Sequence, residues 1–325
     1  MKKIAVKKFA IGMVMTMSLT GVAFAQEPVW DANKVVLESQ KLADGIFAVV
    51  QTGADAMADK GYPIATSSGF IIGTKGVLVI DTMLNERLNK QLMKLIAEQT
   101  DLPVQYAVNT SFHGDHSYGN QYLPKNTLII QHKVASQYIA KNLEADKKFM
   151  IQNFGKGRGI EQVKVTKADI LVGKKSKISI NLGNMVVEIK DYGFAQTGGD
   201  LFVSVPAANV LWTGNPVLAK APALPWLLDG HLVDTMNTLQ VVYDSFDADT
   251  KVVPGHGPVT NIAAIKWHLD YLKAVKKQVE LAIADGLSLK ETVKRVQLPA
   301  FKGYALFGWV HPGLNIPAAY KDLSK

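Results

Sequence analysis

The 325-residue sequence contains no cysteine. The absence excludes a thiolate nucleophile, a zinc site with cysteine ligands and any stabilising disulfide. Chains of this length bury a large share of their surface on folding. The fold can therefore rely on a hydrophobic core alone.

Long apolar runs are also lacking, with one short exception at the N-terminus. Lysines at positions 2, 3, 7 and 8 flank or precede a mostly apolar segment at 9–22, which ends in Ala-Phe-Ala at 23–25. This pattern predicts a secretory signal peptide over residues 1–25, and the apolar segment is short for a membrane span. We expect a mature chain, residues 26–325, in the periplasm or secreted and without a membrane anchor; an uncleaved anchor is the less favoured alternative.

A strongly basic surface is missing as well. The formal net charge is +8, but the four N-terminal lysines leave with the signal peptide and lower it to about +4. The sequence shows no stripe of lysine and arginine with interleaved aromatic residues, which is the pattern typical of nucleic-acid binding. We expect a small-molecule substrate and no nucleic-acid partner, and the sequence does not define the oligomeric state.

Hydrophobic periodicity predicts alternating strands and helices in one domain. Two segments have no clear period and are expected to be loops, 146–162 and 219–229, whose Phe149, Phe154 and Trp226 either contact substrate or cap the core. The tail around Trp309 and His311 shows no motif. The alternation favours an α/β layered domain; expected strands are 45–52, 69–73, 76–81, 104–108, 127–132 and several within 170–215, and expected helices are 86–100, 133–147, 233–246 and 262–284.

The run Ser-Phe-His-Gly-Asp-His at 111–116 is the strongest functional signal, and it follows the expected strand 104–108. His113, Asp115 and His116 place two imidazoles and a carboxylate within four residues. Divalent cations with nitrogen and oxygen ligands require such groups. Gly114 lets the backbone bend so that neighbouring side chains can converge. The run therefore predicts a metal site on a loop.

Three later segments repeat one plan, in which an apolar strand adjoins a glycine turn with a polar residue. They present Gln196 before Thr-Gly-Gly-Asp, Asn215 after Thr-Gly, and His256 within Gly-His-Gly. Alone, each of these turns is a weak signal. Together with the run at 111–116, in this order and spacing, they are specific.

The sequence resembles the metallo-β-lactamase superfamily over roughly residues 40–320. The resemblance implies an αβ/βα four-layer sandwich with the site at one edge of two sheets. The family's first metal position uses three histidines, and the matching residues here are Ser111, His113 and Gln196. The family's second position is complete, with Asp115, His116 and His256, whereas the bridging carboxylate of the family is replaced by Asn215.

The resemblance and its departures predict one tightly held ion at Asp115, His116 and His256. Zinc is the expected metal, and Fe²⁺ is an alternative because two histidines and one carboxylate also suit non-haem iron. Ser111, Gln196 and Asn215 are expected to line the pocket or to form a weak first site. Weak binding of a second ion remains an alternative, because Gln196 offers an amide oxygen as a ligand. Asp81, at the end of a strand, is expected to support a ligand or to form a local turn.

The predicted reaction is hydrolysis of an ester, amide or lactam bond by a metal-activated water. His113 and Asp115 are the predicted catalytic residues, and His113 is a candidate general base or hydrogen-bond donor to the oxyanion. A thioester or sulfate ester would also suit this chemistry. Two alternatives remain: an iron-dependent oxidative enzyme on the same fold, and a non-catalytic periplasmic binding or accessory protein that retains a metal.

Overall fold

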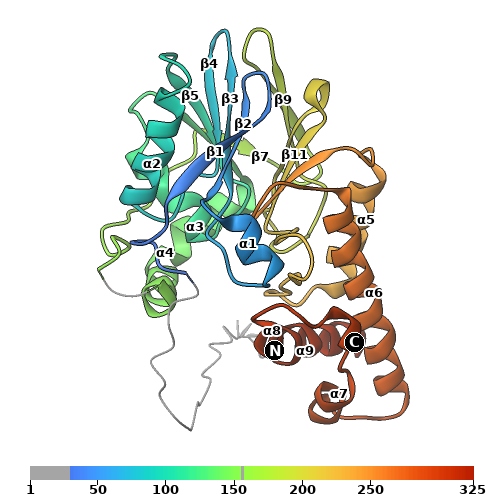
Figure 1. The fold of residues 1–325 in the computed structure, drawn as a ribbon. Coiled ribbons are helices and arrows are strands. Elements are labelled where there is room, and N and C mark those ends of the chain that lie inside the picture. Colours follow the sequence, from blue (N-terminus) through green and yellow to red (C-terminus); the bar gives the residue numbers. More distant parts are fainter. Residues whose placement is uncertain (1–29, 155–156) are drawn as a thin grey trace, which may run out of the picture.

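The computed structural model describes residues 30–154 and 157–325 (Figure 1). The predicted signal peptide, residues 1–25, lies outside the described residues, so its cleavage remains a prediction. None of the helices in the described part combines the length and apolar character needed to cross a membrane.

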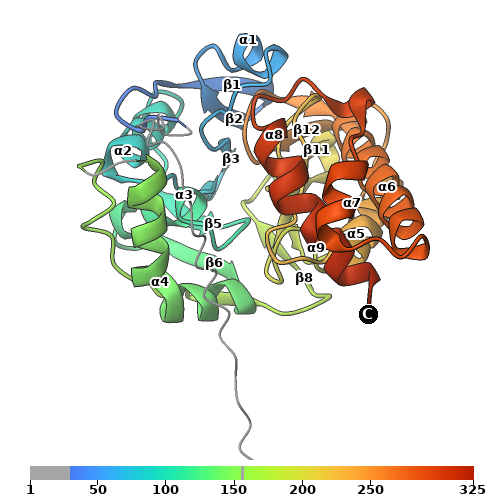
Figure 2. The same cartoon turned by 90° about the horizontal axis from the view of Figure 1, so that it is seen from below.

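Four layers make up the fold. Two sheets face each other in the middle, and helices cover the outer face of each sheet (Figures 1 and 2). Helices α2 (Glu86–Ala97) and α4 (Lys133–Phe154) lie outside the first sheet, and α5 (Leu232–Asp244) and α6 (Ile262–Ala284) lie outside the second. The predicted αβ/βα sandwich is confirmed.

The first sheet contains seven of the strands in the described chain, in sequence order from β1 to β7. The first four strands are antiparallel neighbours, and the pairs from β4 to β7 are parallel. Parallel strands need long crossover connections, which α2, the short α3 (Gly114–Ser117) and α4 supply. The strands are β1 (Leu37–Ala43), β2 (Ile46–Gln51), β3 (Ser68–Gly73), β4 (Gly76–Ile80), β5 (Val104–Val108), β6 (Leu128–His132) and β7 (Ile170–Val172), with α1 (Ala54–Asp59) between β2 and β3.

The second sheet has six strands within the described residues, in the order β13-β12-β11-β10-β9-β8. Only β11 and β12 pair in parallel there, and α5 connects them. The strands are β8 (Lys177–Asn181), β9 (Val186–Lys190), β10 (Phe202–Val205), β11 (Val210–Gly214), β12 (Lys251–Pro254) and β13 (Thr260–Asn261). Each sheet therefore contributes a parallel strand–helix–strand unit to the sandwich.

Three apolar layers hold the sandwich together. One lies between α2 and the first sheet, one between the two sheets, and one between the second sheet and the helices α5 and α6. Strands with both faces covered by apolar layers read as continuous apolar runs, and every residue of β4 is buried. This double burial explains why residues 76–80 could be identified as a strand from composition alone.

The two sheets approach each other closely at Gly69 of β3. The indole of Trp212, on β11, is buried between the sheets and its Nε1 lies 3.4 Å from the carbonyl oxygen of Ser68. A Cβ at Gly69 would lie 2.5 Å from that Nε1 and 2.8 Å from the carbonyl oxygen of Phe47. A side chain at position 69 would therefore push the two sheets apart.

The structure corrects the expectation of a loop over 146–162. Helix α4 continues to Phe154 rather than ending near Lys147. Leu143 and Met150, two helical turns apart, both pack into the core against the first sheet, and this burial outweighs the glycines that follow. The expected loop at 219–229 is confirmed, because it contains no helix or strand.

The C-terminal tail, for which the sequence showed no motif, forms further helices. These are α7 (Leu289–Arg295), α8 (Phe307–Val310), a π-helical turn (His311–Asn315) and α9 (Ile316–Leu323). The buried ring of His311 is hydrogen-bonded to the hydroxyl of Tyr271 of α6. The Asn315 side chain forms hydrogen bonds with backbone atoms of Pro225 and Leu227. The tail is thereby attached to the loop at 219–229.

A Gly69→Ala substitution tests the close approach of the sheets. We expect it to lower the free energy of unfolding by about 1–3 kcal/mol, because the new methyl group overpacks the contact with Trp212. Urea denaturation followed by circular dichroism measures the change. Gly308→Ala is the matched control, because a Cβ there meets nothing within 4 Å; an equal loss in both variants would contradict the packing argument.

Candidate metal centre

The candidate site lies at one edge of the sandwich, where parallel strands of both sheets end. In the first sheet, β4 leads to Asp81 and β5 leads to α3, which carries Asp115 and His116 and is preceded by His113. The predicted loop is therefore corrected to a short helix at these two residues. In the second sheet, β11 leads to Asn215 and β12 leads to His256. Loops at the carboxyl ends of parallel strands form the usual binding crevice of α/β sheets. The fold thus brings together the segments that the sequence singled out.

Three side chains could hold a metal ion. The Oδ2 atom of Asp115 lies 3.3 Å from Nε2 of His256 and 3.7 Å from Nε2 of His116. All three ligand atoms lie within 4.8 Å of one another. Ligand atoms at the corners of a tetrahedron around zinc are separated by roughly 3.3 Å, given metal–ligand distances of about 2.0–2.1 Å. The cluster therefore fits an ion of this size with little movement.

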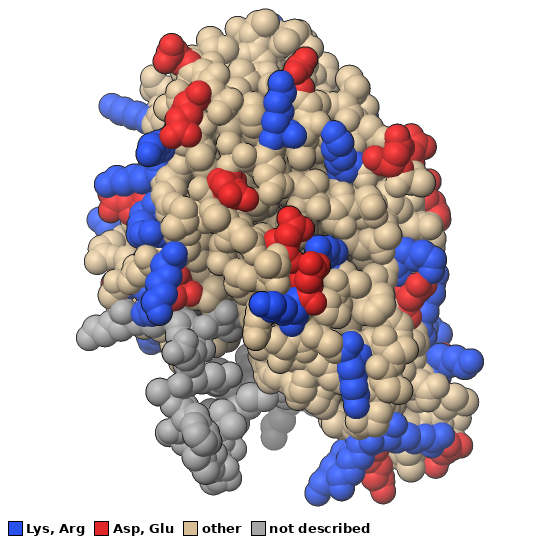
Figure 3. All heavy atoms as spheres, viewed as in Figure 1, with Lys and Arg blue, Asp and Glu red and all other residues tan. Residues whose placement is uncertain are grey.

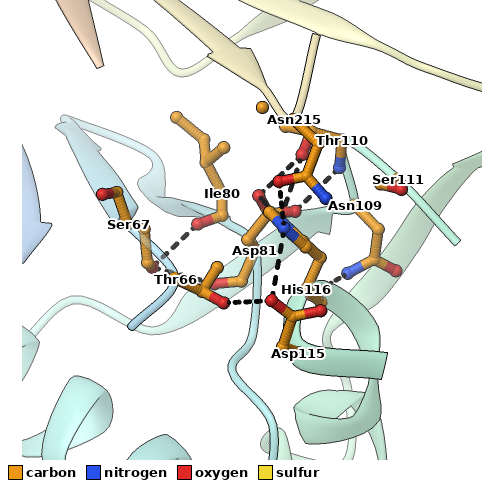
Figure 4. Close-up of polar contacts among 12 residues, drawn as sticks. Thr66, Ser67, Ile80, Asp81, Asn109, Thr110, Ser111, Asp115, His116 and Asn215 are labelled. Carbon is orange, nitrogen blue, oxygen red and sulfur yellow. Dashed lines mark hydrogen bonds and ion pairs between the residues drawn. The ribbon is translucent and has the colours of Figure 1, made fainter. Parts of the chain in front are cut away.

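Hydrogen bonds to the outer ring nitrogens turn both histidines toward Asp115. Nδ1 of His116 lies 2.7 Å from Oδ2 of Asp81 (Figure 4). Nδ1 of His256 lies 2.9 Å from the carbonyl oxygen of Ile64. Each Nδ1–H therefore donates outward and leaves Nε2 facing the cluster. Partners of this kind fix the tautomer of metal-binding histidines. Asp81 has the supporting role that the sequence left open, and Thr66 donates a hydrogen bond of 2.6 Å to Asp115.

The loop that carries His256 is fastened to the first sheet. The backbone N–H of Ser67 donates to the carbonyl oxygen of Gly255, and the Ser67 hydroxyl donates to the carbonyl oxygen of Gly257 at 2.7 Å. A Cβ at Gly255 would lie 2.4 Å from Oδ1 of Asn215. Position 255 is therefore restricted to glycine by the closeness of the two strand ends.

The carboxylates around His116 favour positive charge between them. Burial lowers the pKa of His116, but the carboxylates of Asp81 and Asp115 outweigh this effect and raise the pKa to about 9. Burial likewise raises the pKa of Asp115, but His116, His256 and His113 outweigh it and lower the pKa to about 2. A cation near Nε2 of His116 would satisfy the same carboxylates that otherwise hold a proton on the ring.

Asn215 connects the cluster to His113. Its Oδ1 lies 2.9 Å from Nε2 of His116, and its Nδ2 lies 2.9 Å from Nδ1 of His113. With the amide placed in this orientation, Nδ1 of His113 accepts a hydrogen bond and Nε2 carries the proton. Burial lowers the pKa of His113 to about 4, against the opposing effect of Asp115, so the ring is neutral at pH 7.

The other two residues that match the family's first position differ in their access to the cavity. Ser111 is fully buried, and its hydroxyl accepts a hydrogen bond from the backbone N–H of His113. Gln196 lines the cavity above the cluster, and its buried Oε1 has no hydrogen-bond partner among the described residues. Of the residues expected at a first site, His113, Gln196 and Asn215 reach the cavity, and Ser111 does not line it.

A buried carboxylate holds the turn that presents Gln196. Asp200 accepts hydrogen bonds from the backbone N–H groups of Gln196 and Thr197, at 2.8 and 2.7 Å, and from the Thr197 hydroxyl. Burial raises the pKa of Asp200 to about 7, although these donors oppose the shift. The Thr-Gly-Gly-Asp segment therefore fixes the backbone of Gln196 at the cavity wall.

A cavity of about 220 Å³ opens beside the cluster. Phe149 of α4 and Trp226, which were expected either to contact substrate or to cap the core, both line it. The side chain of Phe154, named with them, lies outside the described part of the structure. Trp30, Tyr304 and Trp309 also line the cavity and were missed, because they come from segments without periodicity that pack on the site from far along the chain.

An Asp81→Asn substitution tests the support of His116. We expect a 10- to 100-fold loss of zinc affinity, because the neutral amide is a weaker acceptor for Nδ1–H. Competition with a chromophoric chelator measures the affinity. Asp191→Asn is the matched control, since Asp191 is a buried partner of His132 outside the cluster; equal affinities of the wild type and the Asp81 variant would contradict this role.

Comparisons with known proteins identify the family of this chain. The family model described as Metallo-beta-lactamase superfamily matches residues 61–256. A metallo-beta-lactamase type 2 from Bacillus cereus is 23% identical over 209 residues, which are 64% of this chain and 73% of the relative.

Two solved structures share the fold. The sec-alkylsulfatase Pisa1 from Pseudomonas sp. has a TM-score of 0.66 and 15% identity, and the match covers 88% of this chain and 50% of that chain. The metallo-beta-lactamase FIM-1 from Pseudomonas aeruginosa, in its mono-zinc form, has a TM-score of 0.56 and 14% identity, covering 73% of this chain and 95% of that chain. The family model spans more than half of the sequence, and the chain belongs to the metallo-β-lactamase superfamily.

Proposed function

We propose that this chain is a metal-dependent hydrolase that holds one zinc ion and cleaves an ester, amide or lactam bond of a small molecule. One observation carries the proposal. The Nε2 atoms of His116 and His256 and a carboxylate oxygen of Asp115 face one another beside a cavity. Three protein ligands with access to a cavity are typical of catalytic rather than structural zinc sites.

Asp115, His116 and His256 would hold the ion. When bound, zinc lowers the pKa of a water molecule toward neutrality and polarises the carbonyl of the substrate. A single ion is supported by the remaining positions: the Ser111 hydroxyl does not line the cavity, and Gln196 and Asn215 offer neutral amides in place of an imidazole and a carboxylate. The mono-zinc form of FIM-1 shows that a relative can be isolated with one zinc.

His113 and Asp115 are the proposed catalytic residues. Asn215 donates to Nδ1 of His113, so the opposite nitrogen, Nε2, is available to donate a hydrogen bond. This arrangement favours a donor to the developing oxyanion over a general base. Oδ2 of Asp115 also faces His256, and the low pKa of Asp115 keeps the carboxylate ionised. The carboxylate can therefore accept a hydrogen bond from a water molecule and orient it.

The net reaction adds one water to the scissile bond. The water oxygen forms a bond to the acyl carbon, and the bond from that carbon to the leaving oxygen or nitrogen breaks. The leaving group takes one proton of the water, and the other proton is released when the new carboxylic acid ionises.

We also propose that the chain acts in the periplasm or outside the cell, after removal of residues 1–25. The support is the N-terminal sequence pattern. A small-molecule substrate, rather than a nucleic acid, is supported by the mixture of basic and acidic side chains on the face seen in Figure 3.

A His116→Ala variant tests the metal assignment. We expect bound zinc to fall from one equivalent to near zero and esterase activity to fall at least about 100-fold, because one of three protein ligands is lost. Elemental analysis of protein purified without added metal, paired with an ester and lactam hydrolysis screen, measures both effects.

Two controls accompany this test. His231→Ala removes a surface histidine and Ser111→Ala removes a hydroxyl outside the cavity, and both should retain metal and turnover. Zinc retained by the His116 variant would contradict the assignment. Iron in the wild-type protein would favour an oxidative enzyme, and tight metal retention without turnover in a broad screen would favour a binding protein.

A His113→Ala variant separates a donor from a metal ligand. We expect kcat to fall about 10²- to 10³-fold, as for loss of one oxyanion donor, while zinc content stays at one equivalent. Steady-state kinetics and elemental analysis of the same preparation measure the two quantities. A parallel loss of zinc would show that His113 is a ligand instead.

A further inference from the structure

The cavity beside the metal centre is apolar on almost every side away from the cluster. Leu218 and Met150 are buried deep in its wall, and Ile64 lies beside His256. Aromatic rings complete the wall, with Trp226 in contact edge-to-face with Trp309 of α8. A bound molecule would thus exchange water for carbon over most of its surface.

The wall formed by the described residues carries no lysine or arginine side chain. The uncharged groups near the cluster include Gln196, whose unpartnered Oε1 can only accept hydrogen bonds. Asp115 adds a carboxylate. An anionic group away from the reacting bond would lose its hydration without gaining a cation, which is costly.

The apolar wall continues out to the rim of the cavity. Phe149 is 58% exposed, Trp309 is 46% exposed and Leu228 is 40% exposed, and all three line the cavity. They come from α4, α8 and the loop at 219–229, on opposite halves of the molecule (Figure 2). Large apolar side chains exposed together around one opening indicate a binding surface.

We propose that the substrate is a neutral ester or lactone whose non-reacting part is an extended apolar chain or ring. The reacting bond lies at the cluster, and the apolar part runs along Leu218 and Trp226 to the rim. This inference rests on the proposed function for the bond that is cleaved. It excludes substrates that carry a carboxylate or sulfate on the part held by the wall.

A binding experiment tests the preference without any catalysis. N-phenyl-1-naphthylamine and 1-anilinonaphthalene-8-sulfonate share one ring scaffold and differ in a sulfonate group. We expect the neutral probe to bind the metal-loaded protein at least about tenfold more tightly, because the sulfonate is desolvated without a cation. Fluorescence titration measures both dissociation constants. Equal affinities would overturn the inference.

A hydrolysis experiment tests it on the reaction. The 4-methylumbelliferyl esters of butyric acid and of succinic acid differ in a terminal methyl against a carboxylate. After division by the spontaneous rates, we expect kcat/KM for butyrate to exceed that for hemisuccinate at least about tenfold. From acetate to heptanoate, kcat/KM should rise roughly threefold to fourfold for each methylene placed against the wall.

A charge placed at the rim provides the matched variant. Leu228→Arg should raise kcat/KM for hemisuccinate several-fold and so reduce the ratio of kcat/KM for butyrate to that for hemisuccinate, with zinc content unchanged. Leu281→Arg, at a 45% exposed position on α6 outside the cavity, should leave both values unchanged. A hemisuccinate cleaved as fast as butyrate by the wild type would overturn the inference while leaving the hydrolase proposal intact. Probe preference without hydrolysis of any ester, amide or lactam would refute the hydrolase proposal and leave only the preference of the cavity for neutral, apolar molecules.

Discussion

The contact between Asp81 and His116 is the interaction on which the site depends. A carboxylate at the end of β4, 1% exposed, holds the ring of a fully buried histidine at 2.7 Å. The same carboxylate accepts from the backbone N–H and the hydroxyl of Thr110, so the strand end and the metal loop share one anchor. Because a buried charge without partners is costly, the loop has little freedom to leave this position. The direction of Nε2, and with it the geometry of the cluster, follows from that anchor.

Asn215 shows how the site can keep its shape after losing charges. The family's bridging carboxylate is replaced by an amide that contacts His116 on one side and His113 on the other. The amide carries no charge to neutralise a second cation, yet its two ends match the two imidazoles. Ser111 and Gln196, at the other changed positions, are likewise uncharged. The Ser111 hydroxyl accepts from the backbone N–H of His113, and the backbone N–H of Gln196 donates to Asp200. The proposal of a single ion follows from these three substitutions together.

Many of the central strands and helices could be predicted from the sequence, because they have strong local patterns, whereas the four-layer arrangement was predicted only through the resemblance to the family. Residues 104–108 and 262–284 form a strand and a helix with the expected bounds, since both carry continuous or periodic apolar residues. The candidate ligands could also be identified, because Asp115 and His116 are neighbours and His256 sits in a marked turn. The residues of the cavity wall could not be identified from the sequence. Trp30, Tyr304 and Trp309 reach the site only through long-range packing, which leaves no periodic signal in their own segments. The extension of α4 was missed for the same reason, because Met150 is buried by tertiary contacts beside a glycine-rich stretch.

Hydrogen bonds of Ser67 with Gly255 and Gly257 join the first half of the polypeptide to the second. Asp115 belongs to the first half and His256 to the second. An ion coordinated by both residues would therefore close a long loop of the polypeptide. Such a closure restricts the unfolded chain in the way that a disulfide does. In a chain without cysteine, such an ion would also serve as a cross-link that stabilises the native state, and its loss would expose the chain to proteolysis.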